Sequence, residues 1–249
     1  MGAGQVEREH TEAIVLKGVD FSETSRIVTL ITPDRGKMAC MAKGVKRPKS
    51  PMAGVLDTFN RIDLVYTWKD TRQVQTLIEA NVANGYAGIK GDLDKSSYGA
   101  FLLELALVVV HDNEPSEDFY IELIQALNQL DDWTGEVAVF GAWATLRLLS
   151  AAGFAPMLST CSTCDKAIEA NPGFAFESGI VCGACSADQR ITVGEYKTLK
   201  ALADYPARCP RIRNGRSIFG LLATYATSQL ESPFRSVRVI RQLERESLG

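Results

Sequence analysis

The sequence predicts an α+β protein in which a small N-terminal β-barrel precedes a helical domain. Residues 13–81 contain five short segments rich in β-branched and aromatic residues, with no helical pattern between most of them. Residues 94–153 repeat apolar side chains at intervals of three and four, which is the period of an amphipathic helix. Residues 161–185 add two C-x-x-C pairs. A strand-rich part followed by a helix-rich part is typical of the α+β class.

Five predicted strands lie in the N-terminal third of the chain. They are residues 13–17, 25–32, 37–45, 55–66 and 73–78. Residues 33–36 (Pro-Asp-Arg-Gly) are typical of a hairpin turn, because glycine readily adopts a positive φ. Short strands at this spacing favour a small barrel such as an OB-fold over residues 1–85. We expect the polar residues 1–12 to form a flexible extension.

Helices are predicted over most of residues 86–249, which we assign to a helical domain. The first helix contains the apolar residues between Tyr98 and Val109, and the second begins at Ser116, where two acidic residues follow a capping residue. Further helices are predicted at residues 136–152, 193–202 and 218–230. Their apolar faces are interpreted as core-forming rather than as cofactor sites.

The two C-x-x-C pairs predict a structural zinc site. Cys161, Cys164, Cys182 and Cys185 form the pairs, with seventeen residues between them. Two residues between thiolates let one tight turn present both sulfurs to a tetrahedral ion. Residues 158–190 therefore predict a zinc-ribbon-like hairpin, which depends on metal because it is too small to bury a core.

Other interpretations of these cysteines fit the sequence less well. No signal peptide is recognisable at the N-terminus, and cytosolic thiols stay reduced, so disulfides are disfavoured. A thioredoxin-like redox pair would open a helix, which residues 158–160 do not resemble. A catalytic zinc would recruit histidine or carboxylate ligands, whereas His10 and His111 lie far away in the sequence. Cys40 and Cys209 are interpreted as small buried hydrophobes.

The net charge of −3 hides an uneven distribution. Residues 1–85 have a net charge of +2, residues 86–160 of −8 and residues 161–249 of +3. A polyanion would be repelled by the middle part and tolerated by the two ends. No apolar run is long enough to span a membrane, so we expect a cytoplasmic protein without a membrane partner.

A basic segment without acidic residues occupies residues 35–56. Its basic residues are Arg35, Lys37, Lys43, Lys46, Arg47 and Lys49. Pro48 and Pro51 exclude a helix in its second half. A rigid basic loop on a small barrel favours contact with nucleic-acid phosphates, because lysine and arginine replace condensed counterions; a solvated loop without a ligand is the alternative. Arginines at residues 208–216 and 235–241 form two further clusters, interpreted as solvated.

The sequence contains no recognisable catalytic constellation. It lacks the phosphate-binding loop, the dinucleotide-binding fingerprint and the G-x-S-x-G motif. It has two histidines and no defensible pair of catalytic carboxylates. We therefore expect a protein that is not an enzyme.

The order of these parts resembles the RecO family of bacterial recombination mediators. The resemblance rests on residues 12–16 with 23–27, the loop 43–50, residues 148–156, the four cysteines and residues 230–238. It implies an N-terminal OB-fold, a helical domain and an embedded zinc ribbon, all in the family's order. Some members lack the zinc ligands, but this sequence retains all four cysteines.

The resemblance also implies a function. Members of the family bind single- and double-stranded DNA, anneal complementary strands and, together with RecR, help RecA replace single-strand-binding protein. Such a protein would be associated with the nucleoid. Two other functions stay open. A zinc-ribbon transcription regulator would prefer one duplex sequence, and a zinc-stabilised adaptor that binds only proteins would have no salt-dependent affinity for DNA.

Overall fold

The computed structural model describes residues 7–246, which form two compact units. One unit comprises the chain up to residue 87 together with residues 106–124. The other comprises residues 88–105 and the chain from residue 125 onward. The predicted domain boundary at residue 85 stays a prediction.

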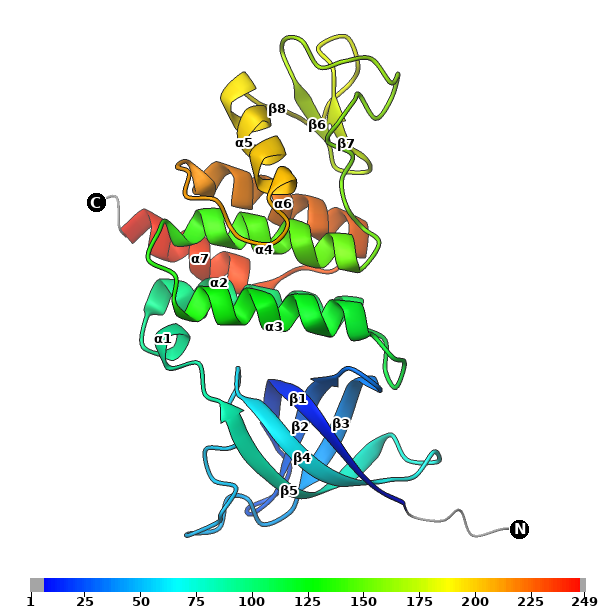
Figure 1. Cartoon of the computed structure of the whole chain (residues 1–249), viewed down its shortest axis with the longest axis vertical. Coiled ribbons are helices and arrows are strands. Elements are labelled where there is room, and N and C mark those ends of the chain that lie inside the picture. The colour runs from blue at the N-terminus through cyan, green and yellow to red at the C-terminus, as the bar shows by residue number, and fades with distance from the viewer. Residues whose placement is uncertain (1–6, 247–249) are drawn as a thin grey trace. The chain divides into compact units, whose positions relative to one another are not determined.

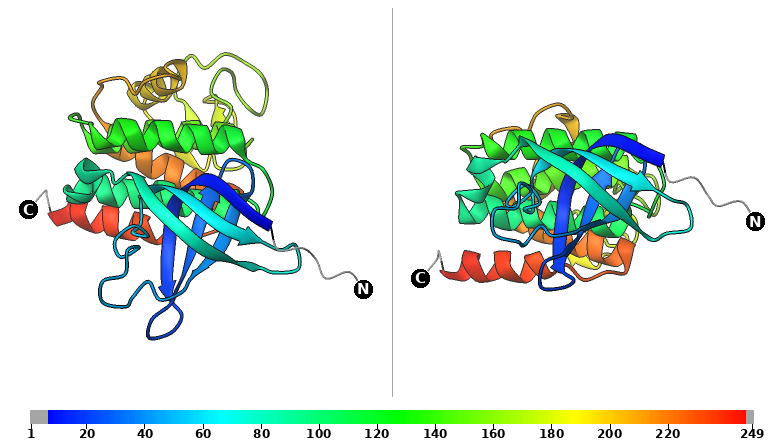
Figure 2. Two further views of the ribbon diagram at one scale, coloured as in Figure 1. Left: turned by 60° about the horizontal axis from the view of Figure 1, so that its bottom comes forward. Right: turned by 90° about the horizontal axis from the view of Figure 1, so that it is seen from below.

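The first unit is built on a closed five-stranded barrel with the strand order β1-β2-β3-β5-β4 (Figures 1 and 2). Its strands are β1 (Glu7–Asp20), β2 (Arg26–Thr32), β3 (Gly36–Ala42), β4 (Arg61–Trp68) and β5 (Val74–Asn84). All neighbours are antiparallel except β3 and β5, which pair in parallel. A closed five-stranded barrel of this kind is OB-like, so the predicted fold is confirmed.

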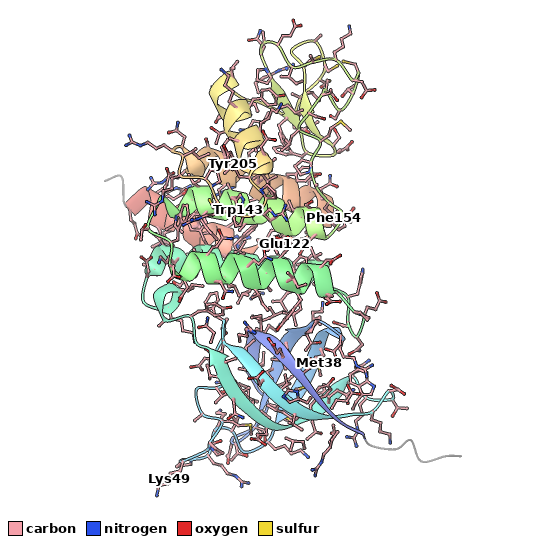
Figure 3. All side chains as sticks on the ribbon, viewed as in Figure 1. Met38, Lys49, Glu122, Trp143, Phe154 and Tyr205 are labelled. Carbon is pink, nitrogen blue, oxygen red and sulfur yellow. The ribbon has the colours of Figure 1, made fainter. Side chains whose placement is uncertain are left out.

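The barrel interior follows from alternation along the strands. Every second residue of β3 is buried, from Gly36 to Ala42, as a strand with one face on a core requires. Met38, labelled in Figure 3, is one of these interior side chains. Leu30 of β2 and Leu64 and Tyr66 of β4 are at most 1% exposed and complete the centre of the core.

The prediction that residues 1–12 form a flexible extension is wrong for residues 7–12, and residues 1–6 lie outside the described part. Residues 7–14 pair with β4, and residues 14–20 pair with β2, so one long strand bridges two neighbours. The polar sequence tolerates this because its carboxylates find partners. Glu9 forms an ion pair with Arg35, and Glu12 forms one with Arg61, each at 2.7 Å.

A second correction concerns the predicted strand over residues 55–66, which begins only at Arg61. Residues 55–59 form turns instead. The amide of Asn60 stabilises them by donating to the carbonyl oxygens of Gly54 and Val55, each at 2.9 Å. Leu56 still reaches the barrel core, which explains why its apolar character resembled a strand. By contrast, β5 is longer than predicted: it continues six residues beyond the predicted end at Ile78, to Asn84.

The helices fall close to the predicted segments. They are α1 (Ala87–Lys90), α2 (Leu93–Val109), α3 (Glu117–Asp131), α4 (Val137–Ala151), α5 (Val193–Asp204), α6 (Gly215–Leu230) and α7 (Arg235–Glu246). The last helix, α7, covers an arginine-rich segment for which the sequence pattern predicted no helix. Among the described residues, no helix is both long and apolar enough to cross a membrane.

The second unit is organised around α4, which packs against α5 and α6 (Figure 1). The close approach depends on glycine, because a Cβ at Gly215 would collide with the backbone of Val139. The Trp143 indole donates to the carbonyl oxygen of Tyr205 at 2.8 Å, which joins α4 to the end of α5. In Figure 3 the labelled Trp143 and Tyr205 lie side by side in this unit.

Between α4 and α5 the chain forms a small sheet with the order β7-β6-β8. Its strands are β6 (Gly173–Ala175), β7 (Gly179–Val181) and β8 (Gln189–Arg190). The sheet is attached to the helices through Phe174, whose ring meets Tyr225 of α6 edge-on at 5.6 Å. Gln229 of α6 adds hydrogen bonds to the carbonyl oxygens of Phe176 and Glu177 at 2.9 and 3.0 Å.

Candidate metal centre and nucleic-acid interface

The four predicted ligands come together at one point. The Sγ atoms of Cys161, Cys164, Cys182 and Cys185 all lie within 4.8 Å of one another. The Sγ atoms of Cys164 and Cys182 are 3.8 Å apart. A tetrahedral ion with metal–sulfur bonds of about 2.3 Å would hold its sulfurs about 3.8 Å apart. The cluster therefore fits a four-thiolate metal ion.

Each C-x-x-C pair is held by a backbone turn. In the first turn, Asp165 donates its N–H to the carbonyl oxygen of Cys161 at 2.9 Å. In the second turn, Cys185 donates its N–H to the carbonyl oxygen of Cys182 at 3.2 Å. Gly183 allows the second turn to lie against residues 170 and 171, since a Cβ there would be 3.1 Å from the carbonyl oxygen of Ala170. The local sequence thus builds both ligand turns.

Arg190 supports the second turn and was not identified from the sequence. Its guanidinium donates to the carbonyl oxygens of Cys182 at 3.2 Å and Cys185 at 2.8 Å, and also to Asn171 at 3.3 Å. Because a guanidinium has several donors in a rigid fork, one side chain joins both ends of the turn. No local motif marks this role, because the arginine reaches the turn only through the pairing of β8 with β6.

The surroundings shift the pKa values of three of these thiols in different directions. Burial opposes ionisation of Cys161, but backbone N–H groups around its sulfur outweigh this and lower its pKa to about 6. The N–H of Ala184 lowers the pKa of Cys182. The neighbouring sulfurs of Cys164, Cys182 and Cys161 raise the pKa of Cys185 to about 12. Four thiolates at this separation need a cation to balance their charge, which a bound metal supplies.

The basic residues of the segment 35–56 lie at opposite ends of β3. Arg35 precedes β3, and its guanidinium lies 4.3 Å from the centre of the Trp68 ring while it pairs with Glu9. Lys37 donates to the carbonyl oxygen of Leu107 at 2.8 Å and lies 3.3 Å from Asp112. Both charges are thus already engaged within their own unit.

The other four basic residues lie together on the loop after β3. This loop (residues 43–60) is a succession of tight turns, in which Arg47, Ser50, Ala53 and Val55 donate their N–H groups to carbonyl oxygens three residues earlier. Its ends are anchored by two buried core residues, Val45 and Leu56. The basic side chains are exposed, with Lys43 just before the first anchor and the other three between the two anchors.

The four basic side chains of the loop differ in whether they form ion pairs. The ammonium of Lys46 forms an ion pair with Asp20 at 2.7 Å, and the same carboxylate pairs with Arg26 at 3.1 Å. These two cations lower the pKa of Asp20, with Lys46 the larger cause. Lys43, Arg47 and Lys49 are exposed and have no ion pair with another described residue. In Figure 3, Lys49 projects from the tip of the loop, away from the strands.

An exposed aromatic residue lies beside this loop. Phe21, in the turn between β1 and β2, is 65% exposed. The same turn is joined to the loop, because Lys46 donates its N–H to the carbonyl oxygen of Thr24 at 3.0 Å and pairs with Asp20. Phe21 was not identified from the sequence, although a single aromatic residue in a polar turn between two strands was the available signal.

The arginine cluster at residues 208–216 is partly engaged. Arg211 donates to the hydroxyl of Thr134 at 3.0 Å, and Arg216 is also engaged in an interaction. The two cysteines outside the metal cluster are buried, as predicted: Cys40 is 0% exposed in the barrel core, and Cys209 is 4% exposed. Burial raises the pKa of each of these thiols to about 12, so neither is a reactive thiolate at neutral pH.

Together, these features define an OB-barrel protein with a helical unit that contains a four-cysteine hairpin able to hold a metal ion. Residues 6–86 match the family described as Recombination protein O N terminal, and residues 90–238 match Recombination protein O C terminal. The chain belongs to the RecO family.

Relatives across distant bacteria have the same family name. The chain is 28% identical to a DNA repair protein RecO of Anaeromyxobacter dehalogenans over 92% of its own length and 86% of the relative's. It is 31% identical to DNA repair protein RecO of Rhodopirellula baltica over 77% and 73% of the two lengths. It is also 31% identical to DNA repair protein RecO of Exiguobacterium sibiricum, over 70% and 69%.

Proposed function

We propose that this chain is a DNA-binding protein of recombinational repair, which holds DNA strands rather than catalysing a reaction on them. Membership of the RecO family and the names of the relatives support the repair role. The observation that supports DNA binding most directly is the loop with Lys43, Arg47 and Lys49 exposed on an OB-like barrel. No described carboxylate forms an ion pair with these three side chains, so a polyanion gains by approaching them.

The loop suits single strands for two physical reasons. Its cations replace counterions along the phosphates, which favours binding without sequence preference. Phe21 offers a flat apolar face to an unstacked base, and stacking of this kind accepts any base. A protein that neutralises strand charge while leaving Watson–Crick edges free would accelerate annealing of complementary strands. Because no phosphate-binding loop motif is present, annealing is expected without nucleotide hydrolysis.

The remaining parts of the proposed role come from the family resemblance. In this proposed role, the chain acts in the cytoplasm on the nucleoid, together with RecR, and helps RecA replace single-strand-binding protein. Zinc is proposed for the four-cysteine cluster, because four thiolates in a closed tetrahedral set suit Zn²⁺. That ion would hold the two ligand turns together and would take no part in chemistry.

The test is a salt series of single-strand binding by fluorescence polarisation. We expect the variant Lys43→Ala, Arg47→Ala, Lys49→Ala to reduce the slope of log affinity against log salt by about 2, since each phosphate contact contributes about 0.7. Thermal stability should barely change, because these side chains are exposed. Removing the exposed Lys197 and Lys200 of α5 shows the effect of losing two positive charges outside the loop. A folded loop variant with the wild-type slope would contradict the proposed interface.

Phe21→Ala separates stacking from charge in the same assay. We expect single-strand affinity to fall by about 1–3 kcal/mol at every salt concentration, with the slope unchanged, because a base loses its stacking partner and no phosphate contact is lost. Replacement by Trp should restore affinity. An affinity equal to the wild type would exclude Phe21 from the interface. Binding that depends strongly on duplex sequence would instead favour a transcription regulator, and no salt-dependent binding would favour a protein-only adaptor.

A further inference from the structure

The last helix, α7, has one face that packs inside its unit. Ser236, Val237 and Ile240 are buried. The hydroxyl of Ser236 donates to the carboxylate of Glu104 at 2.7 Å. Near the other end, the carboxylate of Glu244 accepts a hydrogen bond from the hydroxyl of Tyr98 at 2.9 Å. These contacts set the rotation of the helix about its axis and therefore determine which side chains point outward.

The outward face of α7 is a ridge of arginines, which we call the α7 ridge: Arg235, Arg238, Arg241 and Arg245. Successive members are three or four residues apart, so they are neighbours on one side of the helix. All are exposed, and none forms an ion pair with another described residue. Neither acidic residue of α7 forms an ion pair with the ridge: Glu244 accepts a hydrogen bond from Tyr98, and Glu246 accepts one from Gln242 at 3.0 Å.

Helix stability alone does not account for this arrangement. Cations are favourable at a helix C-terminus and unfavourable at its N-terminus, where the backbone N–H groups are unpaired. Arg245, in the last turn, agrees with this rule, and Arg241 lies in the middle of the helix. Arg235 and Arg238 contradict it, and the first turn of α7 contains no acidic residue. The ridge therefore continues into a turn where positive charge opposes the helix dipole, which points to an anionic ligand.

The dimensions of the ridge match a nucleic-acid backbone. Ten residue steps along an α-helix span about 15 Å. One strand of DNA has a phosphate at every nucleotide, and these phosphates are farther apart through space than the axial rise of about 3.4 Å, so the ridge faces a few consecutive phosphates. All four are arginine rather than lysine, and a guanidinium binds phosphate oxygens in pairs.

We propose that the α7 ridge is a second nucleic-acid site, which binds the sugar–phosphate backbone of one strand independently of the loop after β3. The inference rests on the proposed function, in which the chain binds DNA. It adds that each chain holds two strands, one on the barrel unit and one on the helical unit. Two charge-neutralised strands held by one chain meet at a high effective concentration, which favours annealing.

The experiment counts bound strands. A short oligonucleotide of about six nucleotides, within the size range of one OB-fold site, is titrated into the full chain and followed by native mass spectrometry. The wild type is expected to bind two oligonucleotides. The variant Arg238→Ala, Arg241→Ala is expected to bind one and to anneal complementary strands at least tenfold more slowly. The loop variant is expected to bind one, and the combined variant none. The matched control Lys197→Ala, Lys200→Ala is expected to bind two.

The outcomes separate the two proposals. If the wild type binds no oligonucleotide, the proposed function fails and this inference fails with it. If the loop variant loses all binding while the α7 variant binds like the wild type, DNA binding stands and the α7 ridge is excluded. The α7 ridge is likewise excluded as a nucleic-acid site if the α7 variant loses affinity only for an acidic protein or for anionic lipid vesicles. Alanine is favourable at exposed helix positions, and Arg238→Gln, Arg241→Gln repeats the test if the alanine variant does not fold.

Discussion

The barrel and the cysteine hairpin are both small β-structures, but different forces hold them together. The barrel buries fourteen residues in one cluster, and that cluster extends into the loop after β3 through Val45 and Leu56. The cluster of the hairpin has three buried residues, and two of them, Cys161 and Cys182, belong to the proposed metal site. Apolar burial can stabilise the barrel, whereas the hairpin has too little apolar surface to offset the entropy of ordering its chain.

The comparison indicates how the two regions tolerate change. A barrel with a continuous core loses stability gradually as side chains are shortened. A hairpin held by one ion loses its structure when a single ligand is removed. The following predictions test this difference.

The largest effect is expected from removing a metal ligand. Cys161→Ser should abolish stoichiometric zinc and unfold residues 158–190, because a structural zinc supplies about 10–16 kcal/mol of apparent binding free energy. Elemental analysis measures the metal, and limited proteolysis measures the exposure of the hairpin. Cys209→Ser, which changes a buried cysteine outside the cluster, is the control and should retain the metal. A Cys161→Ser protein with full zinc content would refute the assignment of this ligand.

A smaller effect is expected in the barrel. Leu64 is 1% exposed in the barrel core, and Leu64→Ala should lower the free energy of unfolding by about 2–5 kcal/mol through lost burial and a residual cavity. Chemical denaturation followed by fluorescence measures it. The zinc content should stay at the wild-type value. If Leu64→Ala lowered the zinc content as well as the stability of the barrel, the two regions would not fold separately, and the contrast between them would be wrong.

The smallest effect is expected at Arg190. Arg190→Ala removes hydrogen bonds to the carbonyl oxygens of Cys182 and Cys185, so zinc affinity should fall about 10–100-fold while the ion still binds. Competition with a chromophoric chelator measures this change. Gln189→Ala, at the neighbouring position of β8, is the control and should bind zinc as the wild type does. Equal affinities in both variants would show that the ligand turns need no external support.

Much of the site was predictable because its signals are local. The C-x-x-C spacing sets the turn that presents each sulfur pair, and Pro48 with Gly44 indicates a loop rather than a helix. Phe21 and Arg190 were missed because their roles depend on neighbours distant in sequence. Phe21 matters because residues 44–50 lie beside its turn, and Arg190 because β8 pairs with β6 and brings its guanidinium to the second ligand turn.

The strand and helix pattern, the basic segment and the four ligands were readable from the residues alone, because periodicity, turn chemistry and ligand spacing act over a few residues. The tertiary structure decided which charges are free. Arg35, Lys37 and Lys46 look equivalent to Lys43, Arg47 and Lys49 in the sequence, yet the first three meet carboxylates brought by other segments. It also decided that residues 7–12 form a strand, because β4 lies alongside to pair with them. Such pairing joins residues that are distant in the sequence and close only in the folded chain, so no local sequence pattern predicts it.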